Sequence, residues 1–331
     1  MDVLVAGGTI SFFYLVGILG FFCLFPAPVA AAGIDYASYE ERCVANGWQR
    51  MVVSVSGIDR KILWKAPPEV WNNGAILVFH GGGGSATNWC SGVPAAKPCI
   101  EFSDLALREG FAVFALDSAD GIFIDDEGNT CGKRFICTAQ RPEENQDLEF
   151  IKSVINDIIP SLRSLKSAPD IFIAGISNGG FMTILAATHF DDKITAFVPV
   201  SAGDPYGTYI DCHKDLSIRQ AAPGLFYDSQ TKLNIGEDNA CLAVVYPNEK
   251  EWSTASPARK PAFKQFHNEG DAGVDISCMK KAQTLLVGHG YRDDGPFLVK
   301  NTGKKRLWKH FWAREYNRPI LEFFKKCRRL K

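Results

Sequence analysis

Residues 171–180 read Ile171-Phe-Ile-Ala-Gly175-Ile-Ser177-Asn-Gly179-Gly180, and this stretch decides the fold. Residues 171–174 are apolar and β-prone, as expected of a buried strand, and residues 180–190 have a helical pattern. Between them lies Gly-x-Ser-x-Gly, which in a strand-turn-helix context indicates a serine held on a strained turn with its hydroxyl exposed. We therefore predict that Ser177 is a catalytic nucleophile.

Other apolar runs recur along the chain and alternate with helical patterns. They are almost continuously apolar, which is typical of strands buried on both faces of a mostly parallel sheet flanked by helices. The predicted strands are 75–79, 111–116, 171–174 and 196–200.

Two further patterns belong to the same α/β arrangement. Apolar residues at helical spacing between 148 and 165 predict a helix with a kink at Pro160. Residues 51–55 and 61–65 flank a turn at Gly57, which predicts an antiparallel hairpin that opens the sheet. We also expect helices over 278–287, capped by Gly288-His-Gly290, and over 319–326.

Length and composition allow one large domain or two ordinary ones. The chain has 331 residues, of which 46% are hydrophobic, so a disordered chain is excluded. No repeat or low-complexity tract interrupts residues 33–331, which we predict form a single catalytic domain. Residues 203–260 break the α/β rhythm and are polar, which predicts an inserted cap or lid before the seventh strand.

Charge gives little argument for a polyanionic partner. The net charge is -1, and we expect no nucleic-acid partner. Residues 300–331 nevertheless carry twelve Lys or Arg against Glu315 and Glu322. These cations indicate either solvated helix and strand faces or a field that attracts an anionic substrate.

The first residues predict export. Residues 3–34 carry no charge, and the apolar run 10–25 is short for a membrane-spanning helix. It is followed by Ala30-Ala31-Ala32, a pattern that signal peptidase reads, so we predict a signal peptide over 1–32 and a secreted or periplasmic protein without a stable membrane partner. Asp2 stands where signal peptides carry a positive charge, and an uncleaved membrane anchor is therefore the alternative.

Ten cysteines fit an exported, disulfide-bonded chain. By proximity we expect the pairs Cys90/Cys99, Cys131/Cys137 and Cys212/Cys241. No Cys or His spacing predicts a zinc site, and the acidic loop 120–129 does not fit the calcium-loop pattern. We expect neither a metal nor an organic cofactor.

A glycine-rich loop, His80-Gly-Gly-Gly-Gly84, follows the predicted strand 75–79. Glycine-rich loops in this position leave backbone N–H groups free to approach a developing oxyanion. We expect the two oxyanion donors to be the backbone N–H groups of Gly82 and Asn178, the residue after the nucleophile. Trp89 and Trp312 are candidates to line the substrate site.

Three motifs resemble those of the esterase family of polyhydroxybutyrate depolymerases and type-C-like feruloyl esterases: His80-Gly-Gly-Gly-Gly-Ser85, Gly175-Ile-Ser-Asn-Gly-Gly180 and His267-Asn-Glu-Gly-Asp271-Ala-Gly-Val274. Asp147-Leu-Glu-Phe150 is also similar to that family's pattern. In the His267–Val274 motif, Asn268 stands where the family usually has glycine. The resemblance implies an α/β-hydrolase fold and makes Asp271 the acidic member of a catalytic triad. The residues alone leave Asp275 and Glu269 as alternatives.

The catalytic base must be one of six histidines. We favour His310, which precedes the last helix and whose His310-Phe-Trp312 resembles the family's pattern at the catalytic histidine; His289 is the alternative. The other four sit in motifs, in the insert or at a helix end: His80, His189, His213 and His267.

These patterns predict a secreted serine esterase that cleaves an extracellular polymeric or oligomeric ester through Ser177, His310 and Asp271. Polyhydroxyalkanoates and feruloylated polysaccharides are the substrates that the resemblance implies. One alternative is hydrolysis of an anionic polymer, such as a polyacid amide. The other is a non-catalytic binding protein on the same scaffold.

Overall fold

The structure of the chain is a computed structural model. It describes residues 36–68, 71, 73–92, 94–118, 133–136, 145–163, 169–205, 260–271, 273–300 and 309–328. For three further strands it describes the backbone only: β7 (Ile218–Ala222), β8 (Leu225–Asp228) and β9 (Leu233–Gly236). The predicted leader, the acidic loop 120–129 and most of the predicted insert lie outside the described residues.

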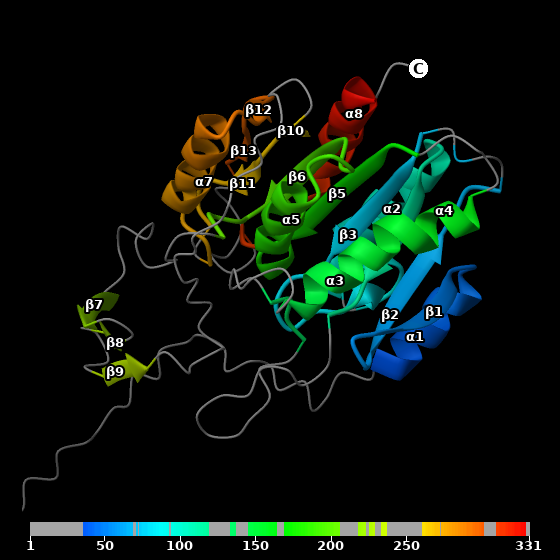
Figure 1. The fold of residues 1–331 in the computed structure, drawn as a ribbon, viewed down its shortest axis with the longest axis horizontal. Helices are drawn as coiled ribbons and strands as arrows, with labels where there is room; N and C mark the ends of the chain where they lie inside the picture. The colour runs from blue at the N-terminus through cyan, green and yellow to red at the C-terminus, as the bar shows by residue number, and fades with distance from the viewer. Residues whose placement is uncertain are drawn as a thin grey trace, which may run out of the picture.

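A ten-stranded mixed sheet forms the centre of the fold (Figure 1). Its main order is β1-β2-β4-β3-β5-β6-β10-β12, and β11 pairs with β6 and β13. β2 is antiparallel to β1 and to β4, and the other pairs are parallel. The strands are β1 (Gln49–Val55), β2 (Ile58–Lys65), β3 (Ala75–Phe79), β4 (Ala112–Leu116), β5 (Ile171–Ile176), β6 (Ala196–Val200), β10 (Ala262–Phe263), β11 (Phe266–Asn268), β12 (Arg292–Asp293) and β13 (Phe297–Val299).

The predicted hairpin and the four predicted apolar runs are all strands of this sheet, which confirms the α/β prediction. β3, β4, β5 and β6 are buried at every position, as a sheet covered on both faces requires. The carboxyl ends of β3, β5 and β6 lie side by side, because all three strands are parallel. This edge is where open α/β sheets place their ligands.

Helices cover both faces of the sheet. Leu148, Leu185 and Leu286 of α3, α5 and α7 belong to one buried cluster, whereas Phe102 and Phe324 of α2 and α8 belong to the other. The helices are α1 (Tyr36–Ala45), α2 (Lys97–Arg108), α3 (Gln146–Ser153), α4 (Ile159–Leu162), α5 (Asn178–His189), α7 (Ile276–Gly288) and α8 (Asn317–Cys327), with short 3₁₀ turns η2 (Ala86–Trp89), η3 (Pro94–Ala96) and η8 (Arg314–Tyr316).

The predicted kink in the helix before β5 is a π-helical segment. Pro160 has no N–H to donate and its ring would meet the carbonyl one turn earlier, so a regular α-helix cannot continue through it. The chain widens into a π-helix over Val154–Ile158 and resumes as α4. Helical structure ends at Leu162, short of the predicted limit.

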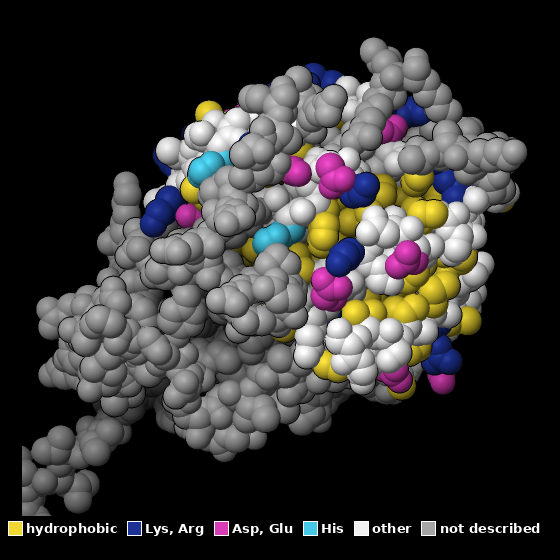
Figure 2. Space-filling model, viewed as in Figure 1, with side chains coloured by type: hydrophobic (Ala, Val, Ile, Leu, Met, Phe, Trp, Pro, Cys, Tyr) yellow, Lys and Arg dark blue, Asp and Glu magenta, His cyan; other side chains and the backbone are white. Residues whose placement is uncertain are grey.

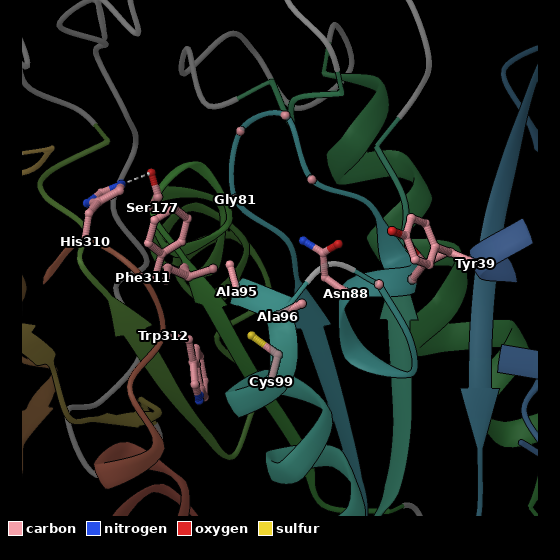
Figure 3. A pocket seen from close by; sticks show the side chains of 16 residues that line it. Tyr39, Gly81, Asn88, Ala95, Ala96, Cys99, Ser177, His310, Phe311 and Trp312 are labelled. Atoms are coloured by element: carbon pink, nitrogen blue, oxygen red, sulfur yellow. Dashed lines mark hydrogen bonds between the residues drawn. The ribbon is translucent and has the colours of Figure 1, made fainter. Parts of the chain in front are cut away.

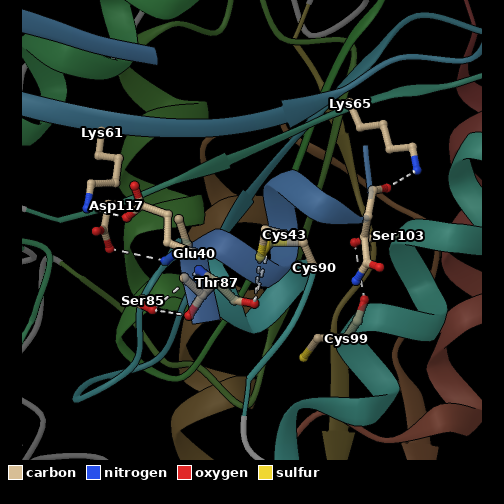
Figure 4. Close-up of a disulfide and its surroundings, with 12 residues drawn as sticks. Glu40, Cys43, Lys61, Lys65, Ser85, Thr87, Cys90, Cys99, Ser103 and Asp117 are labelled. Atoms are coloured by element: carbon tan, nitrogen blue, oxygen red, sulfur yellow. Dashed lines mark hydrogen bonds and ion pairs between the residues drawn. A yellow bond between two sulfur atoms is a disulfide. The ribbon is translucent and has the colours of Figure 1, made fainter. Parts of the chain in front are cut away.

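The structure corrects one predicted disulfide. Cys90 bonds Cys43 of α1, with the two Cα atoms 5.2 Å apart, and the Cys99 thiol is free and buried (Figure 4). Proximity in sequence misled the prediction, because α1 was not foreseen and packs Cys43 directly against η2. Cys278 is also disulfide-bonded. The predicted pairs Cys131/Cys137 and Cys212/Cys241 lie outside the described side chains.

None of the helices among the described residues is long and apolar enough to span a bilayer.

Candidate active site

Ser177 occupies the sharp turn between β5 and α5. Its φ of 52° is a left-handed conformation that few residues other than glycine adopt without strain. Its backbone N–H donates to the Val200 carbonyl of β6 at 2.9 Å, which fixes the turn to the neighbouring strand. Side chains at the flanking glycines would collide with backbone atoms: a Cβ at Gly175 would lie 2.3 Å from the Gly179 oxygen, and one at Gly179 would lie 2.5 Å from the Phe79 oxygen of β3. The motif's glycines are therefore required by close packing.

Three side chains form a chain of hydrogen bonds at the carboxyl edge of the sheet. The Ser177 hydroxyl lies 2.9 Å from His310 Nε2, and His310 Nδ1 lies 2.9 and 3.0 Å from the two Asp271 oxygens (Figure 3 shows the serine and histidine). The carboxylate accepts the Nδ1 proton, which leaves Nε2 to accept the serine proton. The structure thus brings together the three residues that the sequence predicted, from three distant parts of the chain.

Asp271 is placed to act as a buried anion. Its side chain is fully buried, and its Oδ1 accepts the backbone N–H groups of Gly273 at 2.8 Å and Val274 at 3.1 Å. Burial alone would raise the pKa of Asp271, but the hydrogen bond and charge of His310 outweigh it and hold the pKa below its usual value. A Cβ at Gly273 would lie 2.6 Å from His310 Nδ1, so the imidazole packs directly against this backbone.

The alternatives that the sequence left open occupy other positions. Asp275 caps α7 by accepting the Ser277 N–H at 2.7 Å, and Glu269 pairs with Lys300. His289 is the C-terminal cap residue of α7, as the sequence predicted for that segment. None of these three hydrogen bonds to Ser177 or His310 among the described residues, whereas Asp271 bonds His310.

Two buried histidines support the site from behind. His267 donates through Nε2 to the Val274 carbonyl at 2.9 Å and thereby holds the loop that carries Asp271. His80 donates through Nδ1 to the Gly81 carbonyl at 2.7 Å and accepts the Ser118 N–H at Nε2. Burial lowers the pKa of both imidazoles, so they remain neutral. Both imidazoles hydrogen bond to backbone groups, which agrees with the sequence analysis, where their positions in motifs set them aside as the catalytic base.

The hydrogen bonds of the glycine loop orient the backbone N–H of Gly82. The Gly83 N–H donates to the Lys133 carbonyl and the Gly84 N–H to the Gly81 carbonyl. That carbonyl also accepts from His80, which fixes the Gly81–Gly82 peptide plane. Because C=O and N–H point oppositely in a trans peptide, the Gly82 N–H points away from these partners. The backbone of Asn178 begins α5, so its N–H lies at the positive end of that helix.

Sequence reasoning missed a second role for Asn178. Its carboxamide accepts the Phe135 N–H at 2.8 Å and donates to the Phe135 carbonyl at 3.1 Å. The next residue, Ile136, donates its N–H to Asp147, which forms a buried ion pair with Arg60. Segment 133–136 is therefore fastened to the residue after the nucleophile. An amide directly after the serine is the only sequence signal that could have suggested this contact.

A cavity of about 200 Å³ opens beside Ser177 and His310. It is bounded by the glycine loop, by η2 and the start of α2, and by Phe311 and Trp312 (Figure 3). Trp312 lines it as predicted, but Trp89 does not. Trp89 is fully buried behind Trp312, with ring centroids 5.1 Å apart, because its position on η2 turns it into the core. The prediction for Trp89 is corrected accordingly.

No group of three or more His, Cys, Asp or Glu side chains suited to a metal ion occurs among the described residues.

The fold is that of the α/β-hydrolases. Solved structures that match include an acylaminoacyl peptidase from Pyrococcus horikoshii, with a TM-score of 0.51 and 14% identity over 84% of this chain and 41% of that one. A protein of unknown function from Staphylococcus aureus also matches with a TM-score of 0.51, at 13% identity over 84% of this chain and 99% of that one. SOBER1 from Arabidopsis thaliana matches with a TM-score of 0.47 and 15% identity, over 77% and 98% of the two chains. Protein-family models gave no match to the sequence, and neither did the curated proteins.

Proposed function

We propose that this chain is a serine hydrolase that cleaves carboxylic esters through an acyl-enzyme on Ser177. The observation that carries the proposal is the continuous hydrogen-bonded series from Ser177 through His310 to Asp271. A strained serine, an imidazole nitrogen within hydrogen-bonding distance of its hydroxyl and a buried carboxylate are the parts that nucleophilic acyl transfer needs.

The mechanism follows from the geometry. His310 Nε2 removes the proton of the Ser177 hydroxyl as the oxygen attacks the ester carbonyl carbon. Asp271 keeps the imidazole in the tautomer that can accept this proton and stabilises the imidazolium that forms. The N–H groups of Gly82 and Asn178 stabilise the oxyanion. His310 then protonates the departing alcohol, and water, activated by the same nitrogen, releases the acid.

We further propose that the mature protein is exported and acts on an extracellular ester polymer or its oligomers. The charge-free residues 3–34, the alanine triplet and the Cys43–Cys90 disulfide support export. The polyhydroxybutyrate depolymerase and feruloyl esterase resemblance supports an ester of that kind. Polyhydroxyalkanoate and feruloyl esters remain the two candidate classes.

An anionic polymer is less well supported than a neutral ester. Three cations of the basic C-terminal stretch are paired with acids: Arg314 with Glu101, Lys325 with Glu109 and Lys326 with Asp294. On the face drawn in Figure 2, charged side chains of both signs are interspersed. Neither feature builds the field of one sign that attracts a polyanion.

The test is hydrolysis of a panel of four esters and one polyamide by the purified mature chain and by Ser177→Ala. The panel contains p-nitrophenyl acetate, p-nitrophenyl octanoate, methyl ferulate, a hydroxybutyrate oligomer and a poly-aspartate oligomer. Turnover of an ester that falls by roughly 10⁴–10⁶-fold in Ser177→Ala is expected. Absence of both turnover and fluorophosphonate labelling of Ser177 would instead favour a binding protein on this scaffold.

A further inference from the structure

The cavity beside Ser177 extends in one direction as a groove. Ser177 and His310 lie at one end, Tyr39 of α1 lies at the opposite end, and the glycine loop passes over it (Figure 3). The small residues Gly92, Ala95 and Ala96 form part of its wall. The part of the lining that the structure describes contains no Lys, Arg, Asp or Glu. Among the described residues that line the groove, a charged group would lose water without contacting a side chain of opposite charge, so these residues suit an uncharged chain.

Asn88 places a carboxamide in the middle of this groove. It lies on η2, lines the cavity and is half-buried. A Cβ at Gly84 would lie only 2.7 Å from the Asn88 Nδ2, so the glycine leaves room for the amide. Among the described residues, neither the nitrogen nor the oxygen of this carboxamide has a hydrogen-bond partner. A half-buried amide held in this way is available to a ligand.

Tyr39 supplies a second polar group at the far end. Its ring lines the cavity, and its hydroxyl is directed along the groove toward Asn88 (Figure 3). Arg42 stacks on the ring, 4.8 Å from its centroid, and the Cys43–Cys90 disulfide ties α1 to η2, the element that carries Asn88. The two polar groups are therefore fixed relative to each other.

The position of His310 decides which part of an ester enters the groove. The imidazole must protonate the departing alcohol, so the alcohol lies on its side of Ser177. The groove runs from Ser177 away from His310. The acyl chain therefore extends under the glycine loop toward Tyr39.

We infer that the groove from Ser177 to Tyr39 binds an uncharged acyl chain that carries a second oxygen function, which the Asn88 carboxamide and the Tyr39 hydroxyl bind. The inference rests on the proposed ester hydrolysis at Ser177. It adds two specificity-determining residues, and it predicts that a carboxylate at that position of the acyl chain is disfavoured.

The test compares three p-nitrophenyl esters of similar acyl length: pentanoate, 4-oxopentanoate and hemiglutarate. The first has no distal oxygen, the second has a neutral carbonyl and the third has a carboxylate. One net hydrogen bond predicts a kcat/KM about 3–10-fold higher for 4-oxopentanoate than for pentanoate, and hemiglutarate is expected to be the poorest substrate.

The variants Asn88→Leu and Tyr39→Phe remove hydrogen-bonding groups while retaining the approximate shape of each side chain. The ratio of 4-oxopentanoate to pentanoate hydrolysis is expected to fall to about one in Asn88→Leu and to fall in part in Tyr39→Phe. Asn46→Leu, at an exposed amide after α1, is the control and should keep the wild-type ratio. Fluorophosphonate labelling of Ser177 reports that each variant is folded.

The outcomes separate the two proposals. A wild-type ratio near one, or an unchanged ratio in Asn88→Leu, would overturn the inference while Ser177-dependent hydrolysis leaves the proposed function standing. Preference for hemiglutarate would overturn it too. Loss of all Ser177-dependent hydrolysis would remove the proposed function and, with it, the inference.

Discussion

At the scale of single residues, Asp271 is the one of the three hydrogen-bonded site residues whose function can be tested by a substitution that keeps the shape of the side chain. Asp271→Asn preserves the shape but can present an N–H to His310 Nδ1, which would move the imidazole proton to Nε2 and leave Ser177 without an acceptor. We expect kcat on p-nitrophenyl acetate to fall by about 10⁴-fold with little change in fold. Steady-state kinetics measure kcat, and circular dichroism checks the fold. A variant with more than a tenth of wild-type turnover would contradict the assignment of Asp271 as the carboxylate that orients His310.

The choice of base is tested by a matched pair of histidine variants. His310→Ala removes the acceptor of the Ser177 proton and should lower kcat by several orders of magnitude. His289→Ala changes a helix cap outside the cavity and should retain nearly full turnover. The same assay on both variants decides between them, and the reverse pattern would reinstate His289.

The sequence predicted some site residues better than others, for physical reasons. Ser177 was predictable because its strained turn demands glycines at fixed positions in a local motif. Asp271 and His310 come from separate loops, so only the family resemblance and their placement after particular strands identified them. Asn88 and Tyr39 could not be predicted, since nothing local indicates that α1 packs beside the glycine loop.

At the scale of elements, the buried Arg60–Asp147 pair joins β2 to α3 and holds segment 133–136. Asp147→Ala would leave the Arg60 guanidinium buried without its carboxylate, at a cost of about 3–5 kcal/mol in the free energy of unfolding. Glu149→Ala, on the same helix but partly exposed, should change it by less than about 0.5 kcal/mol. Urea unfolding measures both, and equal effects would contradict a structural role for the pair.

A disulfide ties the helix α1 to Cys90, the residue that follows η2. The Cys43–Cys90 bond spans 47 residues, and a closed loop of that length corresponds to about 4 kcal/mol of unfolded-state entropy. The double variant Cys43→Ala/Cys90→Ala should therefore unfold at a markedly lower urea concentration, whereas Cys327→Ser, at a free thiol, should not. A double variant as stable as the wild type would show that packing alone holds α1.

At the scale of the whole molecule, the predictable part of the fold is the part buried on both faces. Continuous apolar runs such as 75–79 and 112–116 are typical of strands covered on two sides, whereas the order of the strands came from the structure. α1 carries only a weak apolar pattern and is held by tertiary contacts and a disulfide. Its position, and the correct partner of Cys90, therefore required the three-dimensional structure.

The two buried histidines make the stability of the whole protein depend on pH. Burial lowers the folded-state pKa of His80 and His267, whereas in the unfolded chain both titrate near 6.5. At pH 7.5 both states are neutral and the full stability is present. As the pH falls below about 6.5, only the unfolded state gains protons, and each histidine lowers the free energy of unfolding by up to about 1.4 kcal/mol per pH unit.

Urea unfolding at pH 7.5, 6.0 and 5.0 should show this loss. His267→Gln removes one titrating group, so its decline between pH 6 and 5 should be shallower than that of the wild type by up to about 1.4 kcal/mol, even if its stability at pH 7.5 is lower. Comparing slopes rather than absolute stabilities separates the titration from lost packing around Val274. Parallel slopes for the two proteins would mean that His267 is protonated in the folded state, and the Asp271 loop would then contain a charged, not a neutral, imidazole.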